Sequence, residues 1–421
     1  MDAMRAELLT IGSELLCGAT PNTNATYLAR RLVDVGIACH RQVTVDDDSV
    51  SIVRALQEAL TRSDLVILTG GLGPTCDDMT IAAIAKAMGR SLIVHPATAA
   101  SIRRFYARRH RTLQRAALRQ AELPKGSIAL PNRLGTAPGL WMSLARLHPR
   151  NPSFIVALPG VPAEMRLIME QSVLPKLKQL RRSAPFATLT LRTAGVVELA
   201  IERVLKQLRL PSSVRVGLYP YLHTVDIQLT VSASSRQAAQ ALLQRIEERL
   251  RRKLGVAIYA MAQESLEQVV GRLLVSRHQT LAVAESCTGG LIGHHLTRIP
   301  GSSRYFRGSV IAYHNDLKRQ LLGVTEKLLN RYGAVSEPVA VTMARKVRLV
   351  TGSDVGLSVT GIAGPQGATP TKPVGLVHFA LADNRGSIHL RCQFIGDRDQ
   401  IKAQAAQTAL NWLRLRLLKN F

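Results

Sequence analysis

A serine and a cysteine lie side by side in a turn of small residues, and both carry side chains that can attack a carbonyl. The turn reads Ala284-Glu285-Ser286-Cys287-Thr288-Gly289-Gly290. Residues 280–284 before it predict a buried strand, and residues 290–297 after it follow a helical pattern. Such a strand–turn–helix exposes a side chain at the end of a sheet and directs backbone N–H groups at an anion. Ser286 is a nucleophile if a base lies beside it, and otherwise an ordinary helix N-cap.

Several further segments of the C-terminal third accompany this turn. A predicted strand at residues 309–313 precedes a cap pair, Asn315-Asp316, and Lys318 at the start of a helix. The other segments are Gly333-Ala334-Val335-Ser336-Glu337-Pro338, Ser358-Val359-Thr360-Gly361-Ile362-Ala363-Gly364-Pro365, Lys372-Pro373-Val374-Gly375 and Gly396-Asp397-Arg398-Asp399. In this order they resemble the C-terminal domain of the CinA family (competence/damage-inducible protein A) over residues 265–421. The resemblance implies an α/β domain that hydrolyses the amide of nicotinamide mononucleotide (NMN), giving nicotinic acid mononucleotide and ammonia.

Amide hydrolysis needs a strong nucleophile, a base and a proton for the leaving ammonia. The resemblance assigns Ser286 as the nucleophile and Lys318 as its general base. A lysine fills that role only when burial or a nearby positive charge lowers its pKa. Tyr313 could relay the proton or orient Lys318. Cys287 is the rival nucleophile because a thiolate attacks more readily at neutral pH, but the resemblance favours Ser286. We expect no metal or other cofactor for this reaction.

Small residues on two loops are candidates for binding the substrate. We expect Thr288, Gly289 and Gly290 either to hold the phosphate of the mononucleotide or to supply N–H groups to the oxyanion, and the sequence leaves both roles open. Gly361 and Gly364 would let a second loop close over the ligand.

Arg398 is a further candidate for contact with the substrate. Its planar guanidinium can bind a phosphate or a carboxylate through two parallel hydrogen bonds. A surface ion pair with Asp397 or Asp399 is the alternative, since both carboxylates are its neighbours in the chain.

The N-terminal part alternates predicted strands and helices. Strands at residues 6–11, 37–45 and 65–68 alternate with helices at 25–35 and 49–61, the second capped by Ser49. The third strand leads into a glycine-rich loop, residues 70–80, and another helix. This alternation predicts a doubly wound α/β domain whose ligand crevice lies at the carboxyl ends of the strands.

The glycine-rich loop has the features of a phosphate site. Glycines allow the backbone to approach a phosphate closely, and the candidate phosphate- or nucleotide-binding residues are Gly70, Gly71, Gly73 and Thr75. Asp77 and Asp78 could hold a divalent metal through oxygen ligands or act as an acid–base pair. The plainer alternative is that one of them caps the next helix.

Three later segments extend this pattern: Leu130-Pro131-Asn132, Gly135-Thr136-Ala137-Pro138-Gly139 and Ala157-Leu158-Pro159-Gly160-Val161-Pro162-Ala163-Glu164-Met165. Together with the loop they resemble the N-terminal CinA domain, which shares its fold with the molybdopterin-binding MoaB and Mog proteins. The resemblance covers residues 7–174 and implies a metal-dependent ADP-ribose pyrophosphatase activity. The alternative is a nucleotide- or pterin-binding scaffold that has no activity. The sequence departs from the family at Pro21 and at Cys76, which stands where the family usually has a polar residue.

The middle of the chain follows a different pattern. Apolar and polar residues alternate over residues 225–231, which predicts a half-exposed strand, and a charged helix spans residues 236–254 before Gly255. This resembles the small α+β connecting domain of full-length CinA proteins, and we predict no chemistry for it. We therefore expect three domains, at residues 1–183, 184–260 and 261–421, with a hinge at residues 261–264.

The chain is strongly basic, with 55 Lys and Arg against 29 Asp and Glu and a formal net charge of +26. Arg104, Arg108, Arg111, Arg115 and Arg119 are spaced to share one helix face. A basic face suits nucleic acid, but aromatic residues that could stack on bases make up only 4% of the chain. We therefore expect small nucleotide substrates rather than nucleic acid as partners.

Targeting signals and cysteine pairs are not evident in the sequence. No apolar run reaches the roughly 18 residues of a membrane span, and the charged N-terminus does not resemble a signal peptide. The five cysteines include no Cys-x-x-Cys pair, which disfavours a zinc site or a disulfide framework. We expect a cytoplasmic protein with no membrane association, and the resemblance to CinA implies a homodimer.

Overall fold

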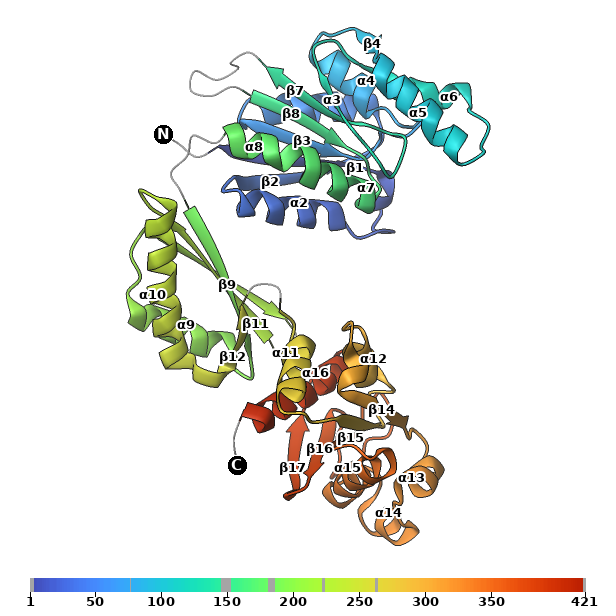
Figure 1. The fold of residues 1–421 in the computed structure, drawn as a ribbon, viewed down its shortest axis with the longest axis vertical. Helices are drawn as coiled ribbons and strands as arrows, with labels where there is room; N and C mark the ends of the chain where they lie inside the picture. Colours follow the sequence, from blue (N-terminus) through green and yellow to red (C-terminus); the bar gives the residue numbers. More distant parts are fainter. Residues whose placement is uncertain are drawn as a thin grey trace. The chain divides into compact units, whose positions relative to one another are not determined.

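The structure is a computed structural model that describes residues 4–75, 77–144, 153–180, 186–221, 224–261 and 264–418. The chain divides into two compact units, Met1–Ala184 and Pro185–Phe421, whose helices and strands are labelled in Figure 1. Cys76 and the predicted hinge positions 262 and 263 lie outside the described residues.

The first unit is built on a six-stranded sheet in the order β2-β1-β3-β8-β7-β6. Its strands are β1 (Arg5–Ile11), β2 (Ala38–Val45), β3 (Leu65–Thr69), β6 (Ile128–Leu130), β7 (Gly139–Leu144) and β8 (Ser153–Leu158). Strands β2, β1, β3 and β8 are parallel, and β7 and β6 are antiparallel to their neighbours. The order of the first three strands reverses between β1 and β3, which is where a doubly wound sheet opens its ligand crevice.

Helices cover both faces of this sheet (Figure 1). Helices α2 (Thr23–Asp34), α7 (Pro162–Ile168) and α8 (Leu174–Leu180) pack on one face, and α3 (Ser49–Leu60) and α4 (Thr80–Ala87) on the other. The side chains of β1 alternate accordingly: Leu8 joins the α2 side, whereas Leu9 joins the α3 side. The predicted doubly wound α/β domain is confirmed.

A small subdomain between α4 and β6 carries the arginines that were predicted to share a helix face. Its elements are β4 (Leu92–Val94), α5 (Pro96–Arg108), α6 (Arg115–Leu118), a short 3-10 turn η1 (Arg119–Ala121) and β5 (Glu122–Pro124). The prediction of one continuous face is wrong, because α5 ends at Arg108 and His110 adopts a left-handed conformation with φ 51°. The chain therefore turns before the last three of these arginines.

Two predicted helix caps are also wrong. Asp48, not Ser49, caps α3, because its carboxylate accepts hydrogen bonds from the N–H groups of both Val50 and Ser51. In the C-terminal part the cap is His314 rather than the pair that follows it, since its Nδ1 accepts from the N–H of Asp316. In both places a nitrogen or oxygen acceptor one residue earlier reaches the free N–H groups.

Residues 186–261 of the second unit form an antiparallel sheet in the order β10-β11-β9-β12. The elements are β9 (Phe186–Ala194), α9 (Glu198–Leu208), β10 (Val214–Tyr221), β11 (Thr224–Ser232), α10 (Arg236–Leu254), a 3-10 turn η3 (Gly255–Ala257) and β12 (Ile258–Met261). Both long helices pack on one face of the sheet. The predicted alternation is confirmed in β11, whose Ile227 and Leu229 are buried while Gln228 is partly exposed.

The remainder of the second unit is a five-stranded sheet in the order β14-β13-β15-β16-β17. Its strands are β13 (Leu281–Glu285), β14 (Phe306–Ile311), β15 (Val355–Gly361), β16 (Leu376–Asp383) and β17 (Gly386–Gln393). Its helices are α11 (Leu266–Ser276), α12 (Leu291–Thr297), α13 (Asn315–Leu322), α14 (Glu326–Tyr332), α15 (Glu337–Thr351) and α16 (Arg398–Leu418). Strands β14, β13 and β15 are parallel, and the last two strands are antiparallel.

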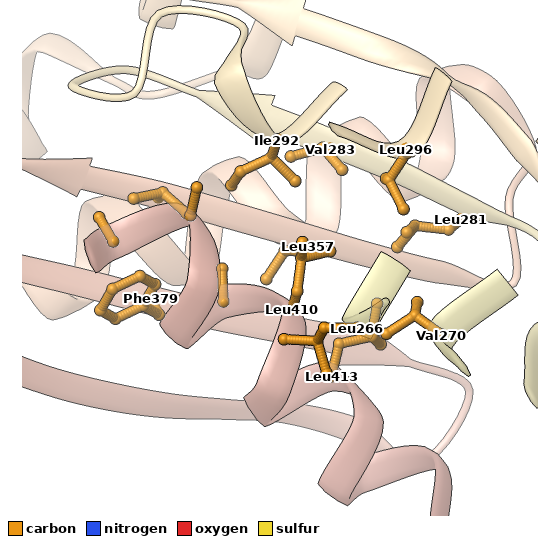
Figure 2. Packing of buried hydrophobic residues seen from close by; sticks show 14 of the residues in the cluster. Leu266, Val270, Leu281, Val283, Ile292, Leu296, Leu357, Phe379, Leu410 and Leu413 are labelled. Atoms are coloured by element: carbon orange, nitrogen blue, oxygen red, sulfur yellow. The ribbon is translucent and has the colours of Figure 1, made fainter. Parts of the chain in front are cut away.

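Apolar layers on both faces hold this sheet in place. Figure 2 shows Leu266 and Val270 of α11 and Leu410 of α16 packed against Leu281 and Leu357 of the sheet. Helices α13, α14 and α15 cover the opposite face through a second buried cluster. The two layers leave the carboxyl ends of the three parallel strands at one edge of the sheet.

Candidate functional site

Three neighbouring strands of the second unit end at the same edge, and each is followed by a loop with candidate residues. Glu285 at the end of β13 pairs in register with Ile311 of β14 and with Val359 of β15. The loop after β13 carries Ser286, the loop after β14 carries Tyr313 and leads into the helix of Lys318, and the loop after β15 carries Gly364. The strand order reverses between β13 and β15, so this edge is the expected place for a ligand.

Ser286 is not a helix N-cap. The N-cap of α12 is Gly290, four residues later, and it makes no side-chain cap hydrogen bond. The N–H of Ser286 continues the sheet by donating to the carbonyl of Val359, 3.0 Å away. The serine side chain is therefore placed by the end of β13 and not by the start of the helix, which leaves the nucleophile role open to it.

Cys287 is almost fully buried, with 5% of its surface exposed. Burial raises the pKa of its thiol to about 12, and the nearby carboxylate of Glu285 acts in the same direction. A thiol with so high a pKa carries very little thiolate at neutral pH. The burial of the Cys287 thiol and its raised pKa therefore favour Ser286 over Cys287 as the attacking residue.

Glu285 is a functional candidate that the sequence analysis missed. Its carboxylate is completely buried, and five donors converge on it. Oε2 accepts from the Thr288 hydroxyl at 2.8 Å and from the N–H groups of Gly290 and Ile292 at 3.0 and 3.1 Å. Oε1 accepts from the N–H of Gly293 at 2.9 Å and from the Ser309 hydroxyl at 3.0 Å.

This carboxylate occupies the helix start, where a phosphate was one of the two ligands that the sequence left open. Thr288 is 1% exposed and its hydroxyl donates to Glu285, as does the N–H of Gly290. Gly289 lies in the same turn with a positive φ of 62°, and its N–H donates to the carbonyl of Ser286. The start of α12 is therefore filled by the chain's own anion, and the phosphate role predicted for Thr288 and Gly290 conflicts with these hydrogen bonds.

Lys318 lies on α13 and is 2% exposed. Its Nζ donates to the carbonyl of Tyr313 at 2.9 Å, and no carboxylate partner of Lys318 is found within the described ranges. Burial lowers the pKa of its ammonium from 10.5 to about 8. This is the condition that the sequence analysis set for a lysine base. Its charge interacts with Cys287, the neighbour of Ser286.

Tyr313 and Arg398 meet at the exposed side of the site, although they lie far apart in the chain. Nη2 of Arg398 donates to the hydroxyl of Tyr313, and its Nη1 donates to the carbonyl of Gly364 at 2.7 Å. The alternative of an ion pair with its neighbours Asp397 and Asp399 has no support among the described ion pairs. Tyr313 is 56% exposed, so it belongs to the surface of the site and not to the core.

The two glycines of the second loop differ in their surroundings. Gly364 has a positive φ of 77° and supplies the carbonyl that Arg398 contacts. Gly361 is the last residue of β15, and a Cβ there would lie 2.8 Å from the carbonyl of Leu376. Gly361 therefore permits the close approach of β15 and β16. Of the two glycines, Gly364 is the one that lies in the loop after β15, where closure over a ligand was predicted.

The first unit has a cavity of about 560 Å³ at the carboxyl edge of its own sheet. The cavity is lined by Gly73 from the glycine-rich loop, by Gly135 and Gly160 from two of the three later segments, and by Arg109 and Arg111 from the basic subdomain. Three segments that the sequence analysis grouped together thus meet at one place. The two arginines give the cavity a positive wall that suits a phosphorylated ligand.

The individual residues of the glycine-rich loop have distinct roles. Gly71 and Gly73 line the cavity, whereas Gly70 has a φ of 110° and a Cβ there would come within 2.2 Å of the Ile11 carbonyl. The N–H and the hydroxyl of Thr75 both donate to Oδ2 of Asp78, at 2.9 and 2.5 Å. Asp78 therefore closes its own loop and does not cap α4, whose N-cap is Met79.

The glycine-rich loop offers two carboxylates, Asp77 and Asp78, as candidate metal ligands. Within the part of the chain that the structure describes, no group of three His, Cys, Asp or Glu side chains could hold an ion. Asp77 and Asp78 are adjacent carboxylates, and one oxygen of Asp78 is already engaged by Thr75. Two carboxylates match the way Mg²⁺ is shared between a protein and the phosphates of its substrate.

Gln120 is a second residue that the sequence analysis missed. It is 8% exposed and lines the cavity. Its Nε2 donates to the carbonyl of Leu72, while its amide oxygen is buried with no partner among the described residues. Only the folded chain brings this amide beside the glycine loop, because 48 residues separate it from Leu72.

These two units define an α/β protein with a doubly wound sheet, a small antiparallel α+β region and a mixed sheet with a serine turn. Three family profiles match the chain: "Probable molybdopterin binding domain" over residues 7–179, "Damage-inducible protein CinA KH domain" over residues 188–260 and "CinA C-terminal domain" over residues 263–417. The structure and these matches agree on a MoaB-like N-terminal domain, a KH-like middle domain and a CinA C-terminal domain.

Relatives match along the whole length of the chain. A CinA-like protein of Cyanothece sp. is 43% identical over 420 residues and covers 98% of both chains. A CinA-like protein of Geobacter metallireducens is 42% identical over 419 residues, covering 99% of this chain and all of the relative. The solved structure of CinA from Thermoplasma acidophilum is 34% identical and covers 42% of this chain and 98% of its own, with a TM-score of 0.38. The chain belongs to the CinA family.

Proposed function

We propose that the C-terminal domain hydrolyses the amide of nicotinamide mononucleotide to nicotinic acid mononucleotide and ammonia. The observation that carries this proposal is the buried Lys318, whose pKa of about 8 makes it a base near neutral pH, at the sheet edge that also bears Ser286. Membership of the CinA family and the high pKa of the neighbouring Cys287 thiol support the assignment of serine as the nucleophile.

The proposed reaction has two steps, the formation of an ester of Ser286 and its hydrolysis by water. Neutral Lys318 accepts the proton of the Ser286 hydroxyl as the serine oxygen attacks the amide carbon. The resulting ammonium returns the proton to the departing amine, which leaves as ammonia and gives an ester of Ser286. Water then attacks this ester, Lys318 accepts the proton of the water and returns it to Ser286, and the carboxylic acid is released. No cofactor takes part in this scheme.

Arg398 is the group that we propose for the substrate's phosphate. Its guanidinium reaches the site edge from the start of α16 and contacts neutral oxygens of Gly364 and Tyr313. A phosphate would replace two neutral acceptors with charged ones, and such bonds are roughly twice as strong. Tyr313 is held by the same arginine and so would respond to the ligand.

Incubation of the purified protein with NMN tests the proposal directly. Ammonia and nicotinic acid mononucleotide should appear in equal amounts, and chelator should leave the rate unchanged. Nicotinamide alone, which lacks the phosphate, should be a poor substrate. Absence of ammonia from a folded protein over a range of pH would refute the proposed function.

The cavity of the first unit supports a second activity, hydrolysis of the phosphoanhydride of ADP-ribose. Arg109, Arg111 and Asp78 line this cavity. The two arginines could bind the phosphates of ADP-ribose, and Asp78 with its chain neighbour Asp77 would hold a divalent ion shared with them. The ion would supply charge neutralisation for the leaving phosphate.

We also propose that the protein binds small nucleotides, forms a homodimer and is located in the cytoplasm. In the described residues no helix is long and apolar enough to cross a membrane.

A substitution at Asp78 checks the metal site. Asp78→Asn keeps an acceptor for Thr75 but removes the negative charge, so it should preserve the loop while abolishing any cleavage of ADP-ribose that depends on Mg²⁺. Glu58→Gln on α3 is a control, because this exposed carboxylate contacts only Arg54 among the described ion pairs. Full cleavage by Asp78→Asn in the presence of chelator would eliminate the metal site.

A further inference from the structure

Glu285 presents an unusual arrangement for a buried acid. It is fully buried at the end of β13, and within the described residues no lysine, arginine or histidine forms an ion pair with it. Removing a carboxylate from water is unfavourable unless hydrogen bonds replace the lost hydration. Three N–H groups and two hydroxyls supply that replacement.

These hydrogen bonds connect three elements around the proposed nucleophile. Thr288 belongs to the turn that contains Ser286, Gly293 belongs to α12, and Ser309 belongs to β14. Glu285 itself precedes Ser286 directly and ends the central strand. Because the carboxylate ties the turn to the helix and to the next strand, it restricts where the backbone of Ser286 can lie.

The same arrangement affects which anions can approach. The free N–H groups at a helix start usually attract a phosphate, but here they already donate to a full negative charge. A second anion at this position would meet Glu285 at short range and would find the N–H groups of Gly290, Ile292 and Gly293 occupied. The turn is therefore suited to a neutral group such as an amide carbonyl.

We propose that Glu285 is a positioning residue for the amide hydrolysis, which fixes the turn of Ser286 and keeps the phosphate of the substrate away from the start of α12. This inference rests on the proposed function. It assigns the amide end of the substrate to the serine turn and the phosphate end to another part of the site.

Steady-state kinetics with NMN on the full chain test this role. Glu285→Gln leaves only one acceptor oxygen for the five donors and turns an NH₂ group towards them, so the turn must shift. A displacement of about 1 Å at a nucleophile costs on the order of 100-fold in rate, and kcat should fall by about that factor. KM should stay within about threefold, because the phosphate is bound elsewhere.

Variants of Thr288 separate the two possible roles of the turn. Thr288→Val removes one donor to Glu285 and should lower kcat about tenfold, the effect expected for losing one hydrogen bond to a charged group. Thr288→Ser retains the hydroxyl and should restore the rate. The double variant Glu285→Gln/Thr288→Val should be little worse than Glu285→Gln, since both act on one hydrogen bond. An increase in KM with unchanged kcat in Thr288→Val, and a lower KM in Glu285→Gln, would overturn the proposal.

Hydrogen exchange supplies a readout that does not depend on activity. The amides of Gly290, Ile292 and Gly293 should be protected in the native chain and should exchange faster in Glu285→Gln. Glu7→Gln, which alters a fully buried carboxylate of the first unit, is the matched control and should leave these three amides and the NMN rate unchanged.

The outcomes also distinguish this inference from the proposed function. If the native protein releases no ammonia from NMN, the proposed function fails, and with it the catalytic part of the inference, whatever the exchange data show. If the native protein is active, and Glu285→Gln retains its kcat or its exchange pattern, then only the role of Glu285 fails.

Discussion

At the scale of single residues, the proposed chemistry depends on a lysine that is buried and has no carboxylate partner among the described residues. Lys318 is nearly inaccessible, and its Nζ donates a hydrogen bond to the neutral carbonyl of Tyr313. The charged form is therefore penalised, and the pKa falls to about 8. A free lysine would be almost entirely protonated at neutral pH and could not accept a proton from a serine.

The activity should consequently depend on pH in a definite direction. The base must be neutral to act, so kcat should rise about tenfold per pH unit below about pH 7 and level off above about pH 9, centred on the lowered pKa of about 8. A rate that continues to rise to pH 10 or beyond would indicate a lysine with an ordinary pKa. Rates measured across this range in constant ionic strength, with folding checked at each pH, provide the measurement.

Substitutions decide which side chain attacks. Ser286→Ala and Lys318→Ala should each lower kcat by several orders of magnitude, because they act as one unit, and the double variant should be little worse than either. Cys287→Ala should keep most of the activity, since its thiol is held protonated. Loss of ammonia release in folded Cys287→Ala, with retention in Ser286→Ala, would reverse the assignment.

At the scale of elements, α11 packs closely on the segment that precedes β14. A Cβ at Gly271 would lie 2.7 Å from the ring and the hydroxyl of Tyr305, and Tyr305 is itself 4% exposed in the large core of this domain. An added methyl group at residue 271 therefore requires the Tyr305 ring to shift. The glycine is therefore required by close approach and not by the backbone conformation of the helix.

Gly271→Ala should accordingly destabilise the second unit, although alanine is the better helix former. Overpacking of a core costs about 1–3 kcal/mol, which exceeds the gain of about 1 kcal/mol in helix propensity. Chemical unfolding followed by a probe in this unit would measure the change. Ser276→Ala, at the exposed end of the same helix, should change the free energy of unfolding by less than about 0.5 kcal/mol. A stabilised Gly271→Ala would show that Tyr305 has room to adjust.

The elements were predictable from the sequence to a large extent, but their contacts were not. The strand and helix around Ser286 follow from apolar periodicity, and the edge shared with Lys318 follows from parallel strands and the family resemblance. The arginine face failed because periodicity does not reveal the turn at His110. In the sequence Glu285 is only a polar residue at the end of a strand. Its hydrogen bond with Ser309 could not be predicted, because the fold brings the two residues together. The contact between Tyr313 and Arg398 spans 85 residues and has no local signal.

At the scale of the whole molecule, the second unit joins the KH-like and the CinA C-terminal domains. Tyr259 and Ala260 of β12 belong to the same buried cluster as α11 and α16. Nη2 of Arg414 on α16 donates to the carbonyl of Val256 at 2.7 Å. The two domains of this unit therefore share core residues, while the domain boundaries predicted at residues 183 and 260 remain predictions.

This shared core changes what is expected of a truncated chain. A fragment of residues 185–421 should hydrolyse NMN at close to the rate of the full chain. A fragment of residues 261–421 should be active but less stable, because it loses Tyr259 from the core and leaves the buried Arg414 without the Val256 carbonyl. Thermal unfolding of both fragments gives the comparison. Equal stability of the two would mean that the KH-like domain adds nothing to the fold of its neighbour.

The long final helix, α16, links two distant contacts within this unit. It is continuous over Arg398–Leu418, and the segment from Arg398 to Arg414 spans about 24 Å at the rise of an α-helix. At its start, Arg398 donates a hydrogen bond to the carbonyl of Gly364 in the candidate site. Near its end, Arg414 donates to the carbonyl of Val256 in the turn after α10. Because both contacts are made from one continuous helix, a shift of α16 along its axis would change the Arg398 and Arg414 contacts together.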